Sequence, residues 1–258
     1  MSLCRLCRIK RANTPFYLNT IGVNAYSLEE LCYYIVNYPI LLDETFYCSE
    51  LAVWVREELG LPGLGRSLER AMEEELDATA FVEAILREDN YLDAAMARAF
   101  SATWVKQSRL SAESRLKKKG DALVKCGKPS AAINVYESLL QNPEAQLSDE
   151  MKASVYHNKG VAAIRLLEYR QALADLEKAW SLSHSGDNLR AYLLAYALCK
   201  PRAQYEEEIK RLGVDPKTAE LIEQELREAA ENVAYPPIPD KEAYLASITS
   251  DYHRQTGV

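Results

Sequence analysis

The chain has 258 residues, of which 48% are hydrophobic and 27% charged, and its formal net charge is −7. This composition is that of a folded globular protein and excludes a largely disordered chain, while the acidic balance argues against a general nucleic-acid binder, which needs clustered Lys and Arg. No apolar run approaches the roughly 18 residues that span a bilayer, and the charged first residues precede no apolar segment, so we expect a cytoplasmic protein without membrane contact.

Residues 1–105 are predicted to be mostly helical, although no motif in them indicates a role. Ten Gly and ten Pro are few for this length, and abundant Ala, Leu and Glu favour helix. Ser27 and Glu30 have the spacing of a capping box, which predicts a helix that stops near Pro39. Residues 16–18 and 21–26 could form short strands or an irregular cover. Apolar spacing predicts further helices at Phe46–Leu59, Leu68–Leu76, Ala78–Arg87 and Tyr91–Val105.

The segment Gly60–Gly65 is rich in glycine but lacks the Gly-Lys-Ser/Thr ending of a phosphate-binding loop. We therefore interpret it as a helix stop followed by a tight turn. The chain also has no nucleophile elbow, and its three histidines stand far apart in the sequence, at His157, His184 and His253. These observations predict a protein that is not an enzyme and binds no cofactor.

Cys4 and Cys7 are the only closely spaced thiol pair among six cysteines. A zinc site needs four ligands, and although Cys32 and Cys48 could in principle complete one, the sequence lacks the second close pair that makes such a signal specific. We therefore predict no metal site and expect the cysteines to be mostly buried apolar residues of a reducing compartment.

Charge changes sharply along the chain. Residues 27–99 contain 16 Asp and Glu against five Lys and Arg, whereas residues 103–130 contain two Asp and Glu against eight Lys and Arg. Runs of charge most often serve as solvated faces. The change nevertheless marks a plausible domain boundary near residue 105.

The middle of the chain contains an internal repeat. Gly120 is followed at +12, +16 and +19 by Ala132, Tyr136 and Leu139, and Gly160 is followed at the same offsets by an equivalent set: Ala172, Leu176 and Ala179. Two facing helices explain these offsets, because a glycine on the first helix lets the second approach closely and a large residue fills the space beside it. The sequence therefore predicts two consecutive helical hairpins.

This pattern resembles the tetratricopeptide repeat. The family has a bulky residue before a Leu-Gly pair, an Ala-x3-Phe in the second helix and a closing Pro; here the bulky residues are Leu116 and Tyr156. The sequence departs from the family in having Lys before each Gly, no closing Pro in the second unit, and 40 residues between the glycines against a usual repeat of about 34. The resemblance covers about 70 residues and implies an all-α fold, a superhelix of helical hairpins preceded by a helical N-terminal region.

A stack of such hairpins needs about three units to bury its faces, so we expect a third pair. Its helices are predicted at Leu189–Leu198 and Arg202–Leu212, followed by a capping helix that starts at Pro216. The domain prediction is thus an N-terminal region at 1–105, repeats with a capping helix at 106–234, and a Pro-containing tail at 235–258. The tail is expected to be extended at Tyr235–Pro239 and helical from Asp240 to about Ser250.

The resemblance also implies a binding site, because first helices of such repeats line a groove that holds partner peptides. By alignment, the expected groove residues are Lys117, Asp121, Lys125, His157, Asn158, Val161, Arg165 and Tyr192. Some family members clamp a terminal carboxylate with Lys and Asn, and Lys117 and Asn158 match that pattern. Asp121 stands where the clamp has Asn and would repel an anion, so we do not expect the clamp.

The leading hypothesis is a non-enzymatic adaptor whose groove binds a peptide or helix of another protein. The alternative hypothesis is a peptide-sensing transcription regulator, in which the helices between Ser27 and Leu59 act as a helix-turn-helix. The strong acidity of that region speaks against DNA contact, because a recognition helix must approach phosphates. The identity of the partner and the oligomeric state are not indicated by the sequence.

Overall fold

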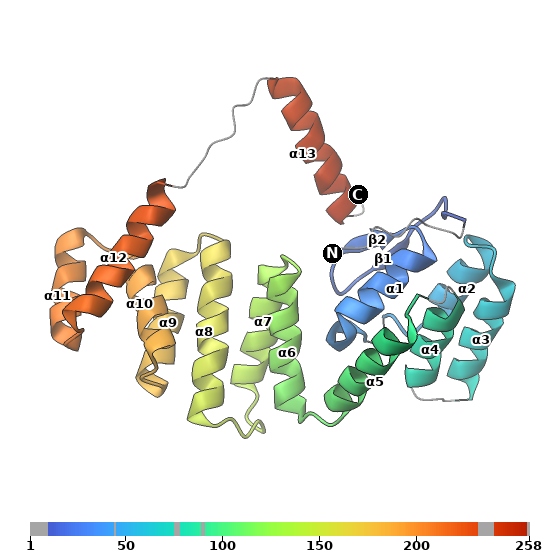
Figure 1. Ribbon diagram of the computed structural model, residues 1–258, viewed down its shortest axis with the longest axis horizontal. Coiled ribbons are helices and arrows are strands. Elements are labelled where there is room, and N and C mark those ends of the chain that lie inside the picture. The colour runs from blue at the N-terminus through green and yellow to red at the C-terminus, as the bar shows by residue number, and fades with distance from the viewer. Residues whose placement is uncertain (1–9, 44, 75–77, 89–90, 232–239, 257–258) are drawn as a thin grey trace. The chain divides into compact units, whose positions relative to one another are not determined.

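The protein is all-α. The computed structural model describes residues 10–43, 45–74, 78–88, 91–231 and 240–256, which form 13 α-helices, one 3₁₀ turn and one short β-hairpin (Figure 1). None of the described helices combines the length and the apolar character needed to cross a lipid bilayer. Contacts divide the chain into two compact units: unit 1 contains residues 1–110 and 240–258, and unit 2 contains residues 111–239.

Unit 1 starts with an antiparallel hairpin of two strands, in which Phe16 pairs with Ala25 and Leu18 pairs with Val23. Its elements are β1 (Phe16–Leu18), β2 (Val23–Ala25), α1 (Leu28–Asn37), the 3₁₀ turn η1 (Pro39–Leu41), α2 (Ser49–Glu57), α3 (Pro62–Glu73), α4 (Ala78–Glu88), α5 (Ala94–Ser108) and α13 (Lys241–Thr256).

The start of α1 follows the capping pattern expected from the sequence. Ser27 Oγ accepts a hydrogen bond from the Glu30 backbone N–H at 3.2 Å, and the Glu30 carboxylate accepts from the N–H of Tyr26. The reciprocal bond thus goes to Tyr26 and not to Ser27, which satisfies a free backbone donor at the helix entry in the same way. The helix ends at Asn37, two residues before Pro39.

The glycine-rich segment differs from the expectation, because α3 already begins at Pro62 and contains two of its three glycines. Only Gly60 has a left-handed backbone, with φ of +70°. Gly65 instead allows α2 and α3 to pack closely, since a Cβ at this position would lie 3.0 Å from Arg56 Cβ and 3.1 Å from the carbonyl oxygen of Ala52. The segment is therefore one tight turn followed by a helix that starts on proline.

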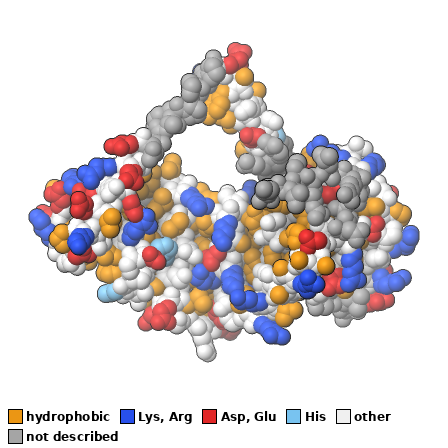
Figure 2. All heavy atoms as spheres, in the orientation of Figure 1, with side chains coloured by type: hydrophobic (Ala, Val, Ile, Leu, Met, Phe, Trp, Pro, Cys, Tyr) orange, Lys and Arg blue, Asp and Glu red, His pale blue; other side chains and the backbone are white. Residues whose placement is uncertain are grey.

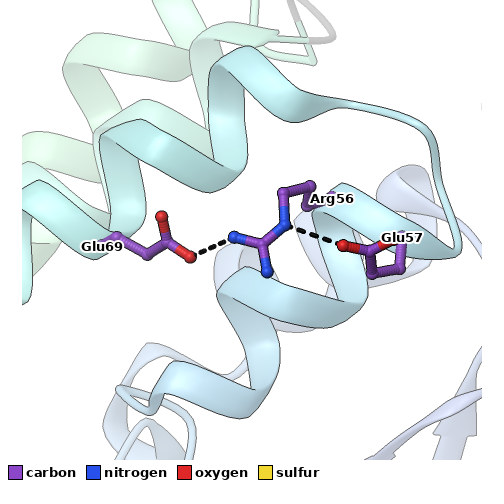
Figure 3. A network of polar contacts seen from close by, with 3 residues as sticks. All are labelled: Arg56, Glu57 and Glu69. Carbon is purple, nitrogen blue, oxygen red and sulfur yellow. Dashed lines mark hydrogen bonds and ion pairs between the residues drawn. The ribbon is translucent and has the colours of Figure 1, made fainter.

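The α2–α3 contact carries a small polar network on its surface. The Arg56 guanidinium lies between the carboxylates of Glu57 and Glu69 and donates to both (Figure 3), with 2.9 Å from Nε to Glu57 Oε1. The network links the two helices through Glu69 of α3.

Unit 2 consists of consecutive helices that pack against their neighbours (Figure 1). They are α6 (Ala112–Lys125), α7 (Pro129–Gln141), α8 (Asp149–Arg165), α9 (Tyr169–Leu182), α10 (Gly186–Cys199), α11 (Arg202–Leu212) and α12 (Pro216–Glu231). The expected bounds of α11 are confirmed, and α10 begins three residues earlier than expected. The extended segment predicted at Tyr235–Pro239 lies outside the described residues.

The two glycines of the repeat lie in the predicted helix contacts. A Cβ on Gly120 would lie 2.7 Å from Tyr136 Cζ, and a Cβ on Gly160 would lie 2.6 Å from Leu176 Cγ and 3.2 Å from the carbonyl oxygen of Ala172. Real side chains do not approach this closely. A large buried residue of the second helix therefore occupies the space that a side chain on the first helix would need.

Each first helix of the three hairpins begins after a serine. The Oγ atoms of Ser111, Ser148 and Ser185 each accept a hydrogen bond at 3.2 Å from the backbone N–H three residues further on. This is N-capping, which satisfies a donor that has no partner within the helix. The serines recur every 37 residues, so the repeat continues into α10.

Candidate functional site

The expected groove residues lie on three first helices, α6, α8 and α10, that neighbour one another in unit 2. On α8, residues 157, 161 and 165 are four apart and share one side of the helix. Residues 117, 121 and 125 have the same spacing on α6. We call this side of α6, α8 and α10 the groove face; its predicted members are Lys117, Asp121, Lys125, His157, Asn158, Val161 and Arg165.

Asp121 is the centre of a hydrogen-bond cluster on the groove face. Its Oδ1 accepts from the Tyr136 hydroxyl at 2.7 Å and from Asn158 Nδ2 at 2.6 Å, and its Oδ2 pairs with Lys117 Nζ at 2.8 Å. Burial, together with the bond to the Asp121 carboxylate, raises the pKa of the Tyr136 hydroxyl well above its usual range. Lys117 and Asn158 are thus already bonded to an acid of this chain, which leaves no clamp for an incoming carboxylate.

His157 of α8 and Asn188 of α10 connect the next two helices, with 2.9 Å between His157 Nδ1 and Asn188 Oδ1. The Asn188 amide nitrogen donates to the carbonyl oxygens of Ala179 and Ser183. Its Oδ1 is therefore the acceptor that faces the histidine, so the hydrogen-bond network places a proton on His157 Nδ1. In the neutral ring, Nε2 is then left as an acceptor.

Between α8 and α10 the surface forms a cleft of about 280 Å³. Its lining combines apolar side chains of both helices with one imidazole and two charged groups. We call it the apolar cleft; it is lined by Val161, Ile164, Ala191 and Leu194, together with His157, Asp187 and Arg190. In the space-filling view, hydrophobic side chains lie among Lys and Arg over the helices of unit 2 (Figure 2). The cleft has room for an apolar side chain of a ligand.

Two cations of the groove face have no carboxylate partner among the described residues. Arg165 donates through Nη1 to the carbonyl oxygen of Val124 at 2.6 Å, and Lys125 is the next residue along α6. Both side chains are exposed. The guanidinium therefore joins the C-terminal ends of α6 and α8 and lies next to the backbone of Lys125.

Tyr192 differs from the other predicted residues because only 3% of its surface is exposed. Its hydroxyl donates to Glu208 Oε1 at 2.8 Å, and Glu208 is in turn held by Arg211. Burial, with the neighbouring Glu208, raises the pKa of Tyr192, and the hydrogen bonds from Arg211 lower the pKa of Glu208. Tyr192 thus belongs to the contact between α10 and α11 and cannot line the groove as expected.

Sequence reasoning missed the residues that α10 contributes to the apolar cleft: Asp187, Arg190, Ala191 and Leu194. The 37-residue period of the capping serines indicates where α10 begins, but not which of its residues face α8, because α8 has 17 residues while α6 and α10 have 14 each. Arg190 makes a two-pronged contact with Glu225 of α12, at 2.8 Å from both Nε and Nη2 to Oε2.

An ion cluster around the buried Lys159 and Asp175 connects the first two hairpins. Lys159 Nζ lies 2.9 Å from Glu137 Oε1 and 3.4 Å from Asp175 Oδ2, and Gln171 donates to the same Asp175 oxygen. Burial lowers the pKa of Lys159, but the two carboxylates raise it by more, so the net shift is upward. Lys159 therefore keeps its charge, and the cluster links α7, α8 and α9.

The thiol pair Cys4 and Cys7 lies outside the described residues. Cys32 is buried and its Sγ lies 3.8 Å from the Ile85 carbonyl oxygen, while Cys48 Sγ lies 3.4 Å from the Thr45 carbonyl oxygen. Within the described ranges, no group of three or more His, Cys, Asp and Glu side chains is arranged to hold a metal ion.

Comparisons with protein-family models, with curated proteins and with solved structures gave no match to this chain. The likeness to tetratricopeptide repeats therefore remains a resemblance carried by the residues themselves.

Proposed function

We propose that the chain is a non-enzymatic adaptor that belongs among tetratricopeptide-like repeat proteins, and that its groove face binds a peptide segment of another protein. The observation that carries the proposal is the apolar cleft between α8 and α10. Four apolar side chains lie half-buried at its walls, and covering such a surface with a ligand side chain is favourable.

The surroundings of the apolar cleft support a peptide as its occupant. A peptide presents apolar side chains together with backbone donors and acceptors. The lining of the cleft has apolar side chains that can contact the former and a histidine that can bond to the latter. His157 Nε2 can accept a backbone N–H, because the bond to Asn188 occupies the proton on Nδ1. His157 and Asn188 connect α8 to α10, and the Asp121 and Lys159 clusters fix α8 against α6, α7 and α9, so the site is preorganised.

The experiment is selection of random twelve-residue peptides, displayed on phage, against the full chain. Selected peptides are synthesised with a fluorescent label and titrated with wild type, with Ala191→Glu and with Leu198→Glu. Ala191 lines the apolar cleft, whereas Leu198 is exposed on the same helix outside it. We expect Ala191→Glu to weaken binding at least tenfold, since burial of one leucine-sized side chain is worth about 1.5–3 kcal/mol, and Leu198→Glu to bind within twofold of wild type.

Selection of no peptide, or equal affinity of wild type and Ala191→Glu, would refute the proposal, provided that circular dichroism shows both variants folded. The transcription-regulator hypothesis is separated by titration of the chain with random duplex DNA at low salt. We expect no binding there, and tight, salt-dependent binding would favour the regulator.

A further inference from the structure

We propose that the peptide held by the groove is acidic: it places an apolar side chain in the apolar cleft and an Asp or Glu, two to four residues away, against Lys125 and Arg165. This inference rests on the proposed function and adds the chemistry of the partner. It follows from which charges of the groove face are already neutralised and which are not.

Three charged residues of the groove face and the apolar cleft are already paired within the chain and are not available to a ligand. Lys117 is paired with Asp121 at 2.8 Å, and Arg190 is paired with Glu225 at 2.8 Å. Asp121 also accepts from Tyr136 and Asn158, so neither its negative charge nor the charge of Lys117 is free to select a ligand. The acidic residue that speaks against a carboxylate clamp is therefore neutralised inside the protein.

Two cations of the groove face remain available to a ligand. In the described part of the chain, Lys125 and Arg165 form no ion pair, and the Arg165 guanidinium lies next to the backbone of Lys125 because it donates to the carbonyl oxygen of Val124. Only one guanidinium N–H is used in that bond, so Arg165 retains donors for a carboxylate in its fork geometry. Each residue ends a helix, where a positive charge is favoured by the helix dipole.

The spacing along α8 between the residues of the apolar cleft and Arg165 sets how far a bound peptide must reach. Along α8, Arg165 lies four residues past Val161 and eight past His157, or about 6 and 12 Å at 1.5 Å per residue. An extended peptide covers these distances in about two to four residues. The cleft is also lined by the exposed carboxylate of Asp187, in the first turn of α10, which disfavours an acid of the peptide beside it.

The experiment uses a synthetic library of nonapeptides with Leu fixed at the centre and all other positions mixed, bound to the full chain and sequenced. We expect Asp and Glu to be enriched at positions two to four residues from Leu, on one side only. For single peptides, Lys125→Glu with Arg165→Glu should weaken binding about tenfold or more, and the same library on this double variant should then select Lys and Arg at those positions.

The matched control is Arg170→Glu with Lys217→Glu. It makes the same change in net charge at two exposed cations of α9 and α12 that line no part of the cleft. It should bind within twofold of wild type. Both double variants are first checked for unchanged circular dichroism and melting temperature.

Two failures are distinguishable. Selection of peptides that depend on the apolar cleft but show no acidic preference, or an acidic preference that survives the Lys125 and Arg165 reversal, overturns this inference and leaves the peptide groove standing. Peptides that bind Ala191→Glu as well as wild type overturn the groove and this inference together.

Discussion

At the scale of the residue, the two glycines of unit 2 decide how closely its helices approach. Gly120 faces the ring of Tyr136, and Gly160 faces Leu176 and the backbone of Ala172. A glycine costs helix stability, so its presence in the middle of a helix is explained by the contact. This part of the packing could be predicted from the sequence, because the offset from each glycine to the large residue is the same in both hairpins.

The first prediction concerns Gly160→Ala. The new Cβ would lie 2.6 Å from Leu176 Cγ and 3.2 Å from a backbone oxygen that cannot move freely, so we expect a loss of about 1–3 kcal/mol in the free energy of unfolding, as for overpacked cores. Gly63→Ala is the control, because a Cβ in that helix meets nothing within 4 Å, and it should be neutral or stabilising by up to about 1 kcal/mol. Urea denaturation measures both, and equal stabilities of the two variants would contradict the packing.

The second prediction concerns Leu167, which has φ of +63° and lies 70% exposed between α8 and α9. Gly127 occupies the same place between α6 and α7, with φ of +72°. A left-handed backbone costs an ordinary residue about 1–2 kcal/mol, and glycine avoids most of that cost. We expect Leu167→Gly to raise the free energy of unfolding by about 0.5–1 kcal/mol and Gly127→Ala to lower it by about 1 kcal/mol. Thermal melts measure both changes. A lower melting temperature for Leu167→Gly, or a higher one for Gly127→Ala, would contradict the left-handed backbone at these two positions.

At the scale of the element, most helices could be predicted from caps, prolines and apolar spacing. The sequence does not predict which residues of α10 face the groove, because α8 has 17 residues while α6 and α10 have 14 each. The glycine of α8 therefore lies three residues further from its cap than the glycine of α6. Counting forward from the groove residues of α8 to find their equivalents in α10 consequently leads to Tyr192, which is buried. Pro62 shows a second limit: a glycine-rich stretch predicts a turn locally, but the close packing of α3 on α2 keeps Gly65 helical.

The third prediction concerns the segment before β1, which is held at α2 by the carboxylate of Glu58 and by Trp54, whose Nε1 donates to the carbonyl oxygen of Thr14 at 2.7 Å. Glu58 Oε2 accepts from the backbone N–H groups of Asn13 and Thr14, both at 3.1 Å, and these bonds lower the pKa of Glu58. A lowered folded-state pKa gives stability that is present above the unfolded pKa, near 4.3, and is lost as pH falls through the folded value. We expect amide exchange at Asn13 and Thr14, measured by NMR and corrected for intrinsic rates, to lose protection below about pH 4.

The control for this prediction is Glu58→Gln, which should have weaker protection at neutral pH and little pH dependence in the same range. A wild-type protection that stays constant from pH 7 to pH 3 would show that the Glu58 bonds do not hold the segment.

At the scale of the whole molecule, the chain consists of two helical units, of which unit 2 is built from repeated hairpins. Unit 2 repeats one hairpin with a serine cap, a small-residue contact and a polar cluster between successive first helices. The sequence predicts this repeat because the spacing from the glycine to the residues of the second helix occurs in two successive hairpins. It does not predict the apolar cleft, because the cleft depends on residues of α8 and α10 that are brought together only when the hairpins stack. In the described residues of unit 1, we find no comparable repeat that would indicate a function.

The most direct measurement is NMR of the methyl-labelled chain with the tightest selected peptide. We predict intermolecular nuclear Overhauser effects from the apolar side chain of the peptide to the methyl groups of Val161, Ile164 and Leu194, and none to the exposed Leu198 or Leu221. Contacts confined to methyl groups outside the apolar cleft, with these three unaffected, would contradict the account.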